Sequence, residues 1–270
     1  MSERDTYPHG VPNWVEALVP DPGTATDFYA GIFGWRFDGP GKMPDEPSSE
    51  YFVARLRDRD VAGIGSQPSG APAPAWITHI RTDSADATVE AVRKAGGTVV
   101  VDAFDVPPVG RMAVLDDPSG GRFAAWEADG REGAQLVNEP GAWAMSALLT
   151  PDAAAAEEFY GSVFGWNRES FGGPVSMFRL PGFVGGEPQQ PVSRDVVAAM
   201  VDLGPDSVAA AQWRPDFWVA DIDEVAAKVG EHGGTVIEQP AEVPGVPMRS
   251  GVVADPYGAA FSVTQLEMSA

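Results

Sequence analysis

The feature of this sequence that most constrains its fold is an internal repeat. The phrase FYAGIFGW at residues 28–35 returns as FYGSVFGW at residues 159–166, which is 131 residues later. Residues 76–100 and 213–237 form a second matching pair, offset by 137 residues. Self-similarity at a fixed spacing marks a duplicated structural unit. The chain is therefore predicted to contain two copies of one domain, and its 270 residues suffice for two domains of ordinary size.

A third match lies near the end of each copy. AVLDDPSGGRFAAW, residues 113–126, aligns with GVVADPYGAAFSV, residues 251–263, and in both a proline follows an aspartate, Asp117 or Asp255. A polar, glycine-bearing segment separates the copies, which is typical of a linker. The predicted organisation is an N-terminal tail at 1–10, a first domain at 11–127, a linker at 128–140 and a second domain at 141–268.

Each half divides again into two smaller units. Residues 13–19 alternate as a strand does, PDPG breaks them, and a helical pattern then ends at Gly34, before three short β-like runs. The next quarter reads as a strand, a capped helix ending in AGG and three more strands, while GIGSQPSG at 63–70 indicates a loop. The sequence therefore predicts an α+β fold in which a βαβββ module occurs four times. The predicted modules are 11–70, 74–127, 141–205 and 211–268.

Composition narrows the possible partners and location. Lys and Arg number 18 against 39 Asp and Glu, for a net charge of −21, so phosphate backbones and anionic membrane surfaces are disfavoured. There is no cysteine, so neither a disulfide framework nor a thiolate site is expected. No apolar run reaches membrane-spanning length and the first residues lack a signal-peptide pattern. We therefore expect a cytoplasmic protein that binds neither nucleic acid nor membrane.

The order of these motifs resembles the vicinal oxygen chelate (VOC) superfamily, which includes glyoxalase I, bleomycin- and fosfomycin-resistance proteins and extradiol dioxygenases. The resemblance covers residues 11–268 and is strongest to tandem, four-module glyoxalase-like proteins of actinobacterial type, some of which are labelled hydroxylases. It implies two tandem VOC domains, each built from two modules whose mixed sheet curves into a cup that holds the ligand. The FYxxxFGW phrase is then mostly scaffolding, because its aromatic residues recur at helical spacing.

The resemblance also implies where a divalent metal would be held, and this chain has no suitable side chain there. The family's ligand positions on the first strands and last strands of the modules are occupied by Trp14, Ile77, Ala124, Met145, Arg214 and Ser262. His9, His79 and His232 are scattered and form no ligand pair. We therefore predict no metal site and no cofactor.

Strand alternation indicates which residues share a face with those positions. Glu16 and His79 lie two residues beyond Trp14 and Ile77 and are predicted to act as an acid/base pair in the first cup. The other reading is a satisfied, purely structural buried pair. The ligand-binding residues predicted for the first cup are Trp14, Arg81, Arg122 and Trp126.

The second cup is predicted to be more apolar, with a few polar anchors suited to a flat molecule. Its predicted ligand-binding residues are Met145, Arg214, Asp216, Trp218 and Ser262. No phosphate-binding or serine-hydrolase motif accompanies them.

Together these features favour a metal-independent protein that binds or transforms a bulky aromatic metabolite, such as a polyketide, quinone or antibiotic. One alternative is sequestration without turnover, as in bleomycin-resistance proteins. A second is a metal-free isomerase, cyclase, lyase or hydroxylase-like enzyme that uses Glu16 and His79. The third is a metal-dependent glyoxalase or dioxygenase. A monomer or a homodimer is expected, because tandem copies supply within one chain the pairing that a dimer supplies otherwise.

Overall fold

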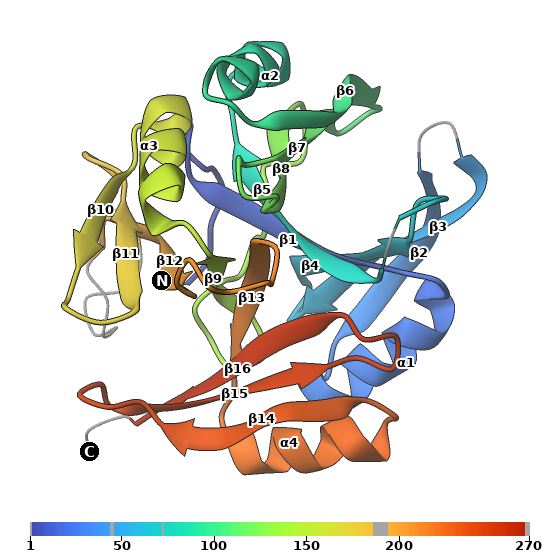
Figure 1. Ribbon diagram of the computed structural model, residues 1–270. Helices are drawn as coiled ribbons and strands as arrows, with labels where there is room; N and C mark the ends of the chain where they lie inside the picture. The colour runs from blue at the N-terminus through green and yellow to red at the C-terminus, as the bar shows by residue number, and fades with distance from the viewer. Residues whose placement is uncertain (1, 44–45, 72, 186–193, 268–270) are drawn as a thin grey trace.

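The computed structural model describes residues 2–43, 46–71, 73–185 and 194–267 (Figure 1). The elements of the first half are β1 (Pro12–Val19), α1 (Pro22–Phe33), β2 (Arg36–Met43), β3 (Glu46–Leu56), β4 (Arg59–Ser66), β5 (Ala75–Arg81), α2 (Ala85–Lys94), β6 (Thr98–Val106), β7 (Gly110–Asp116) and β8 (Arg122–Ala128). Those of the second half are β9 (Trp143–Thr150), α3 (Ala153–Phe164), β10 (Asn167–Ser170), β11 (Val175–Arg179), β12 (Val196–Asp202), β13 (Gln212–Trp218), α4 (Ile222–Glu231), β14 (Thr235–Glu242), β15 (Met248–Ala254) and β16 (Ala260–Leu266). The predicted α+β fold with a repeating βαβββ module is confirmed.

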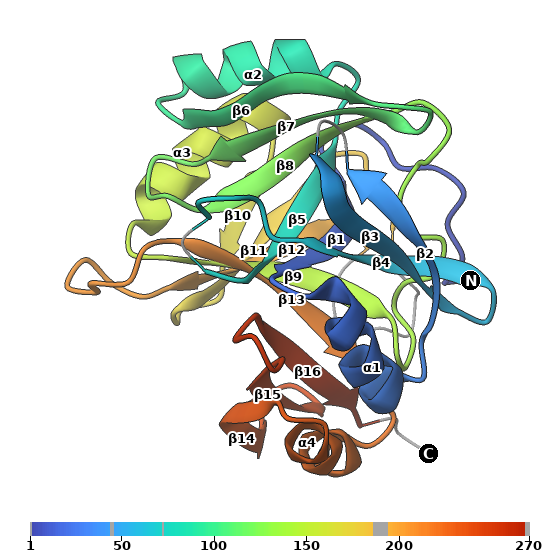
Figure 2. The same cartoon turned by 90° about the vertical axis from the view of Figure 1, so that its right-hand side faces the viewer.

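Each half forms one mixed, curled sheet of eight strands. The strand orders are β2-β3-β4-β1-β5-β8-β7-β6 and β10-β11-β12-β9-β13-β16-β15-β14, so the two sheets have the same topology. The modules of each half join through a central antiparallel pair, β1 with β5 and β9 with β13. In this register Glu16 lies opposite Ile77, and Ala147 lies opposite Arg214. Both sheets curve away from these central pairs (Figure 2).

The repeated FYxxxFGW phrase forms the end of α1 and of α3. Both helices begin with an aspartate whose side chain accepts a hydrogen bond from a backbone N–H of the first turn, Asp21 in α1 and Asp152 in α3. Both helices end on a glycine in the left-handed region, Gly34 with φ 70° and Gly165 with φ 73°. Glycine adopts this conformation without a steric penalty, which explains why each copy of the phrase has glycine before tryptophan.

The two domains are held together by exchanged packing between modules. The core around α1 includes residues from β13, α4 and β16, and the core around α3 includes residues from β5, α2 and β8. Accordingly, α1 contacts α4 and α3 contacts α2 (Figure 1). Each Phe-Tyr pair therefore packs against both domains, which makes the repeat an interdomain connector rather than a reactive motif.

Two equivalent hydrogen bonds join the domains. The hydroxyl of Tyr29 donates to Asp255 at 3.0 Å, and the hydroxyl of Tyr160 donates to Asp117 at 3.1 Å. The acceptors are the aspartates of the two Asp-Pro turns, each in the domain opposite its tyrosine. The same buried tyrosine–aspartate hydrogen bond therefore occurs twice, once in each direction between the domains.

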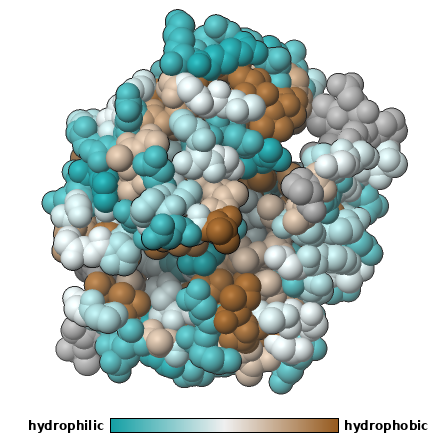
Figure 3. Space-filling view, in the orientation of Figure 1, coloured by the Kyte–Doolittle hydropathy of each residue, from teal (hydrophilic) through white to brown (hydrophobic). Residues whose placement is uncertain are grey.

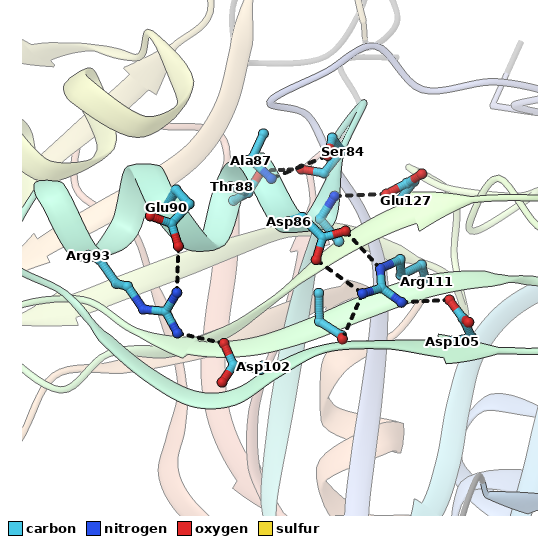
Figure 4. Close-up of polar contacts among 12 residues, drawn as sticks. Ser84, Asp86, Ala87, Thr88, Glu90, Arg93, Asp102, Asp105, Arg111 and Glu127 are labelled. Atoms are coloured by element: carbon cyan, nitrogen blue, oxygen red, sulfur yellow. Dashed lines mark hydrogen bonds and ion pairs between the residues drawn. The ribbon is translucent and has the colours of Figure 1, made fainter.

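Arginines anchor the helices of the second and fourth modules, α2 and α4, on their sheets, and Figure 4 shows the contacts of α2. Arg111 on β7 donates to both carboxylate oxygens of Asp86 in α2 and to Asp105 on β6. Arg249 on β15 makes the same pair of bonds to Asp223 in α4. The aspartates are exposed, so each pair orients its helix with only a small contribution to stability.

The segment between the sheets, residues 129–142, runs along the first domain. The Ala134 N–H donates to the Asn13 carbonyl at 2.8 Å, and the Gln135 N–H donates to the Asp60 carbonyl at 2.7 Å. The Asn13 side chain donates in turn to the Glu132 carbonyl at 2.6 Å. These bonds bring Arg131 and Gly133 to the inner face of the first sheet.

Among the described residues, no helix combines the length and the apolar character needed to cross a bilayer. The surface seen from the side of Figure 1 is largely hydrophilic, with apolar residues in separate patches (Figure 3).

Candidate functional site

A large cavity occupies the concave face of the first sheet, and we call it the first cup. Its volume is about 1190 Å³, and strands from both modules of the first domain line it. Aromatic and aliphatic side chains dominate the wall, including Trp14, Trp126, Phe104 and Met112. The second domain also borders it, through the start of β13 and the turn before β16. The first cup is therefore closed partly by the neighbouring domain, which the within-domain pairing expected from the sequence did not include.

The central strands β1 and β5 bring Glu16 and His79 together at the base of this cup. Both are buried, with 6% and 3% of their surface exposed, and His79 Nε2 lies 3.1 Å from Glu16 Oε1. The contact is close but lacks the geometry of a hydrogen bond, so we describe it as a carboxylate–imidazole contact. Within the described residues, His79 Nδ1 has no hydrogen-bond partner.

A tyrosine on β3 completes the buried polar group. Tyr51 donates to Glu16 Oε2 at 2.8 Å, and Trp14 Nε1 donates to the Tyr51 hydroxyl at 3.0 Å. Trp14, Tyr51, Glu16 and His79 thus form one chain that fixes both carboxylate oxygens of Glu16. Such a chain holds the imidazole in a single position against the cavity.

The environment sets the charge states of this chain. Burial alone would raise the pKa of Glu16, but the neighbouring His79 and the hydrogen bond from Tyr51 together outweigh burial, so the pKa lies below its ordinary value. Burial, reinforced by the nearby Glu16 charge, raises the pKa of Tyr51 well above its usual range. At neutral pH Glu16 is therefore a carboxylate and Tyr51 a neutral hydrogen-bond donor.

Two glycines of β4 make room for the Tyr51 ring. A Cβ atom on Gly63 would lie 2.0 Å from the Tyr51 hydroxyl oxygen, and a Cβ atom on Gly65 would lie 2.9 Å from the ring. The interpretation of residues 63–70 as a loop is wrong for 63–66, which complete β4. Alternating glycines within a strand can signal a ring lying across it, and that signal could have pointed to Tyr51.

Two arginines line the cup. Arg122, on β8, donates to both oxygens of Asp116 at 2.8 and 2.9 Å. Arg131, from the segment between the domains, lies over the Trp14 ring with its guanidinium carbon 5.6 Å from the ring centroid. Arg131 was not expected from the sequence, because a linker residue reaches the cup only through the hydrogen bonds of its segment.

Arg81 is placed differently from the other predicted first-cup residues. Trp14, Glu16, His79, Arg122 and Trp126 all line the cavity, whereas Arg81 does not. Its guanidinium lies 3.7 Å from Asp83 and 3.7 Å from Glu132. Arg81 is the last residue of β5, and its side chain points toward acidic residues outside the cavity.

The positions at which the fold family holds a metal do not fit one in this chain. In the first domain they carry the indole of Trp14, the aliphatic chain of Ile77 and the methyl group of Ala124. Glu16 and His79 could each donate to an ion, but they contact one another. The part of the chain that the structure describes contains no cluster of three or more His, Asp or Glu side chains that could complete a site.

The concave face of the second sheet, the second cup, carries different groups. Arg214, Asp216 and Trp218 alternate with buried residues along β13 and are half-buried. Met145 on β9 lies opposite Asp216, and Ser262 on β16 lies beside Asp216. The five residues predicted for the second cup therefore share one face.

Asp216 is held by a hydroxyl rather than by a histidine. Thr264 donates to Asp216 at 2.7 Å, and Thr264 and Ser250 are 3.1 Å apart. Burial raises the pKa of Asp216 to about 7, against the smaller opposing effects of the Thr264 hydrogen bond and of Arg214. Burial also lowers the pKa of Arg214.

The sequence matches family models in both halves of the chain. Residues 11–124 match the model of the glyoxalase/bleomycin resistance protein/dioxygenase superfamily, and residues 133–264 match that of a glyoxalase-like domain. The chain is 35% identical over 275 residues to "Putative glyoxylase CFP32" of Mycobacterium tuberculosis, covering 97% of both proteins. It is 32% identical over 269 residues to the anthracycline biosynthesis protein DnrV of Streptomyces peucetius, covering 95% of this chain and 94% of that protein.

Solved structures show the same fold at low identity. The Mn(II)-bound glyoxalase from Novosphingobium aromaticivorans superposes with a TM-score of 0.64 at 14% identity, covering 96% of this chain and 83% of that one. The 2,3-dioxygenase LapB from Pseudomonas sp. KL28 superposes with a TM-score of 0.63 at 12% identity, covering 95% and 93%. The chain belongs to the glyoxalase/bleomycin resistance protein/dioxygenase (VOC) superfamily and contains two tandem domains of it.

Proposed function

We propose that this protein binds a bulky, largely planar aromatic metabolite of polyketide or quinone type in the first cup, without a metal. The observation that carries the proposal is the cavity of about 1190 Å³ with a buried Glu16–His79 pair at its base. Drug-sized ligands occupy pockets of about 300 to 1,000 Å³, so this cavity has room for several fused rings. Trp14 and Trp126 supply flat apolar walls.

Similarity to relatives supports the ligand class. The protein that the chain matches at 32% identity over nearly its full length is named for anthracycline biosynthesis, and anthracyclines are fused aromatic ring systems. A cavity with apolar walls and a few polar groups suits such a molecule, because the rings bury apolar area while the ring oxygens need hydrogen bonds.

Binding can be tested with quinizarin, a tricyclic hydroxyquinone, by following the quenching of tryptophan fluorescence. We expect one saturable site. Trp126→Ala should weaken binding about tenfold, since losing an aromatic contact costs on the order of 1.4 kcal/mol. The matched control is Trp218→Ala in the second cup, which should leave the affinity unchanged. Absence of saturable binding, or an equal loss in both variants, would refute the proposal.

A second candidate function is metal-free acid/base catalysis on the bound metabolite, and the Glu16–His79 contact favours it. A histidine held by a carboxylate can accept and return a proton near neutral pH. This candidate predicts turnover of a hydroxyquinone or polyketide substrate in excess EDTA, lost in both Glu16→Gln and His79→Ala. Sequestration alone predicts binding with no turnover, and activity that EDTA removes would point to the metal-dependent alternative.

A further inference from the structure

The charges that line the first cup contrast with those of the whole chain. The chain has a net charge of −21, yet the charged residues of the cavity wall include three permanent cations, Lys42, Arg122 and Arg131. Among the described residues, two carboxylates, Glu16 and Asp38, line the same wall. Arg122 is paired with Asp116 and Arg131 with Asp60, so the wall is close to neutral within an acidic protein. Such a wall repels an anionic ligand less than the acidic outer surface does.

His79 presents an unused nitrogen in this setting. Its Nε2 faces Glu16, and its Nδ1 lacks a hydrogen-bond partner among the described residues, although the ring is 97% buried. His79 lines the cavity, and a buried polar atom without a partner is costly, so a ligand hydroxyl that reaches this nitrogen would satisfy it. The Tyr51–Glu16 hydrogen bond prevents the carboxylate from turning away from the imidazole.

We infer that the first cup takes an aromatic ligand with an acidic phenolic or enolic hydroxyl, and that His79 Nδ1 accepts the proton of that hydroxyl. The O–H bond of the ligand breaks, an N–H bond forms on Nδ1, and both electrons of the broken bond remain on the ligand oxygen. The product is a bound phenolate or enolate that accepts a hydrogen bond from the imidazolium. No redox partner is required. This inference rests on the proposed function and adds the chemical class of the ligand and the ionised form in which it is held.

Each charged group around His79 has a defined part in this transfer. Glu16, from β1, is a positioning residue that stabilises the imidazolium without touching the ligand. Tyr51, from β3, keeps Glu16 in place. Arg122, from β8, is paired with Asp116, and Arg131, from the segment between the domains, is paired with Asp60. Their guanidinium groups line the cavity, where they favour the ligand anion only weakly because these carboxylates offset their charge.

The test uses the colour change of quinizarin on ionisation. With the full chain in excess over dye, we expect the bound dye to ionise at a pH at least about one unit below that of free dye, a tenfold preference for the anion. Quinizarin dimethyl ether, which cannot ionise, should bind more weakly near neutral pH. His79→Asn should still bind the dye but lose the shift. Glu16→Gln should show a smaller shift than the wild type, and Asp216→Asn in the second cup should show the full shift.

The outcomes separate this inference from the proposed function. Tight binding of both dye and ether with no ionisation shift in the wild type would overturn the inference and leave aromatic binding standing. A shift of equal size in His79→Asn would overturn the role of His79. Failure of the wild type to bind either molecule would overturn both. Because the wild-type titration decides the first point alone, a variant that fails to fold does not remove the test.

Discussion

The two cups of this molecule rest on equivalent strands but carry different groups. Relating the copies by the repeat offsets, Glu16 corresponds to Ala147 and His79 to Asp216. The strand pairings agree, because Glu16 lies opposite Ile77 as Ala147 lies opposite Arg214. The first cup therefore has a buried carboxylate–imidazole pair where the second has a methyl group beside a carboxylate.

The scaffold has not diverged in the same way. The Tyr29–Asp255 and Tyr160–Asp117 hydrogen bonds are 3.0 and 3.1 Å long, and both helices end on a glycine in the left-handed region. Interdomain packing constrains both copies equally, because each copy supplies half of each core. The inner faces of the sheets are free of that constraint. The interdomain frame is therefore the same in both copies, whereas the groups that line the two cups differ.

The largest expected effect tests whether the hydrophobic cores around α1 and α3 contribute equally to stability. Phe28 and Phe159 are almost fully buried, with 2% and 1% exposed, and each packs against a glycine of the other domain. Phe28→Ala and Phe159→Ala should each lower the free energy of unfolding by about 3 to 5 kcal/mol, measured by denaturant titration. A large loss in only one of them would show that the two cores are not equivalent.

The variant Gly63→Ala should displace Tyr51 in the first cup. The added methyl group would collide with the Tyr51 hydroxyl and approach the Glu16 Cβ atom at 3.1 Å, so the Tyr51–Glu16 bond should be lost. We expect a cost of about 1 to 3 kcal/mol in unfolding free energy and a reduced ionisation shift of bound quinizarin. Ala199→Gly, at the equivalent position of β12, should leave that shift unchanged. An unaltered shift in Gly63→Ala would contradict the positioning role of Tyr51.

The variant Asp216→Asn should change how the stability of the protein depends on pH. Because burial raises the folded pKa of Asp216 to about 7, its contribution to stability is fully present below the unfolded pKa near 4 and is lost as pH rises through 7. The variant should match the wild type near pH 4 and exceed it by about 1 to 2 kcal/mol at pH 8. This figure is reduced from the full shift because Asp216 is only half-buried. Thermal unfolding at both pH values measures the difference, and equal curves at pH 8 would count against it.

The smallest expected effect concerns the helix anchors. Arg111→Ala and Arg249→Ala remove exposed ion pairs to Asp86 and Asp223. Each should lower the free energy of unfolding by about 1 kcal/mol or less, and by similar amounts. Thermal unfolding measures both, and a loss of several kcal/mol in either would mean that the anchor contributes more than helix orientation.

Much of this molecule could be predicted from its sequence because local patterns carry the information. The FYxxxFGW phrase, the Asp-Pro turns and the glycines that end the helices specified four βαβββ modules. Alternation along β1 and β5 was enough to place Glu16 and His79 on one face. These signals depend only on neighbours within an element, and such neighbours are visible in a single sequence.

The rest depends on contacts between distant segments, which no local pattern reports. Tyr51 reaches Glu16 only because β3 lies two strands from β1, across the glycines of β4. Arg131 enters the cup through backbone hydrogen bonds of its segment to Asn13 and Asp60. Tyr29 and Tyr160 each bond to the other domain only because of the way in which the two domains pack together. Arg81 shares the strand of His79, but Asp83 and Glu132 hold it outside the cavity.

The most direct test of the central claim, that the first cup is the ligand site and His79 touches the ligand, is a crystal structure of the protein with quinizarin. We expect the dye against Trp14 and Trp126, with one ring oxygen within hydrogen-bonding distance of His79 Nδ1. Dye bound only in the second cup, or a metal ion held between Glu16, His79 and the dye oxygens, would contradict the claim.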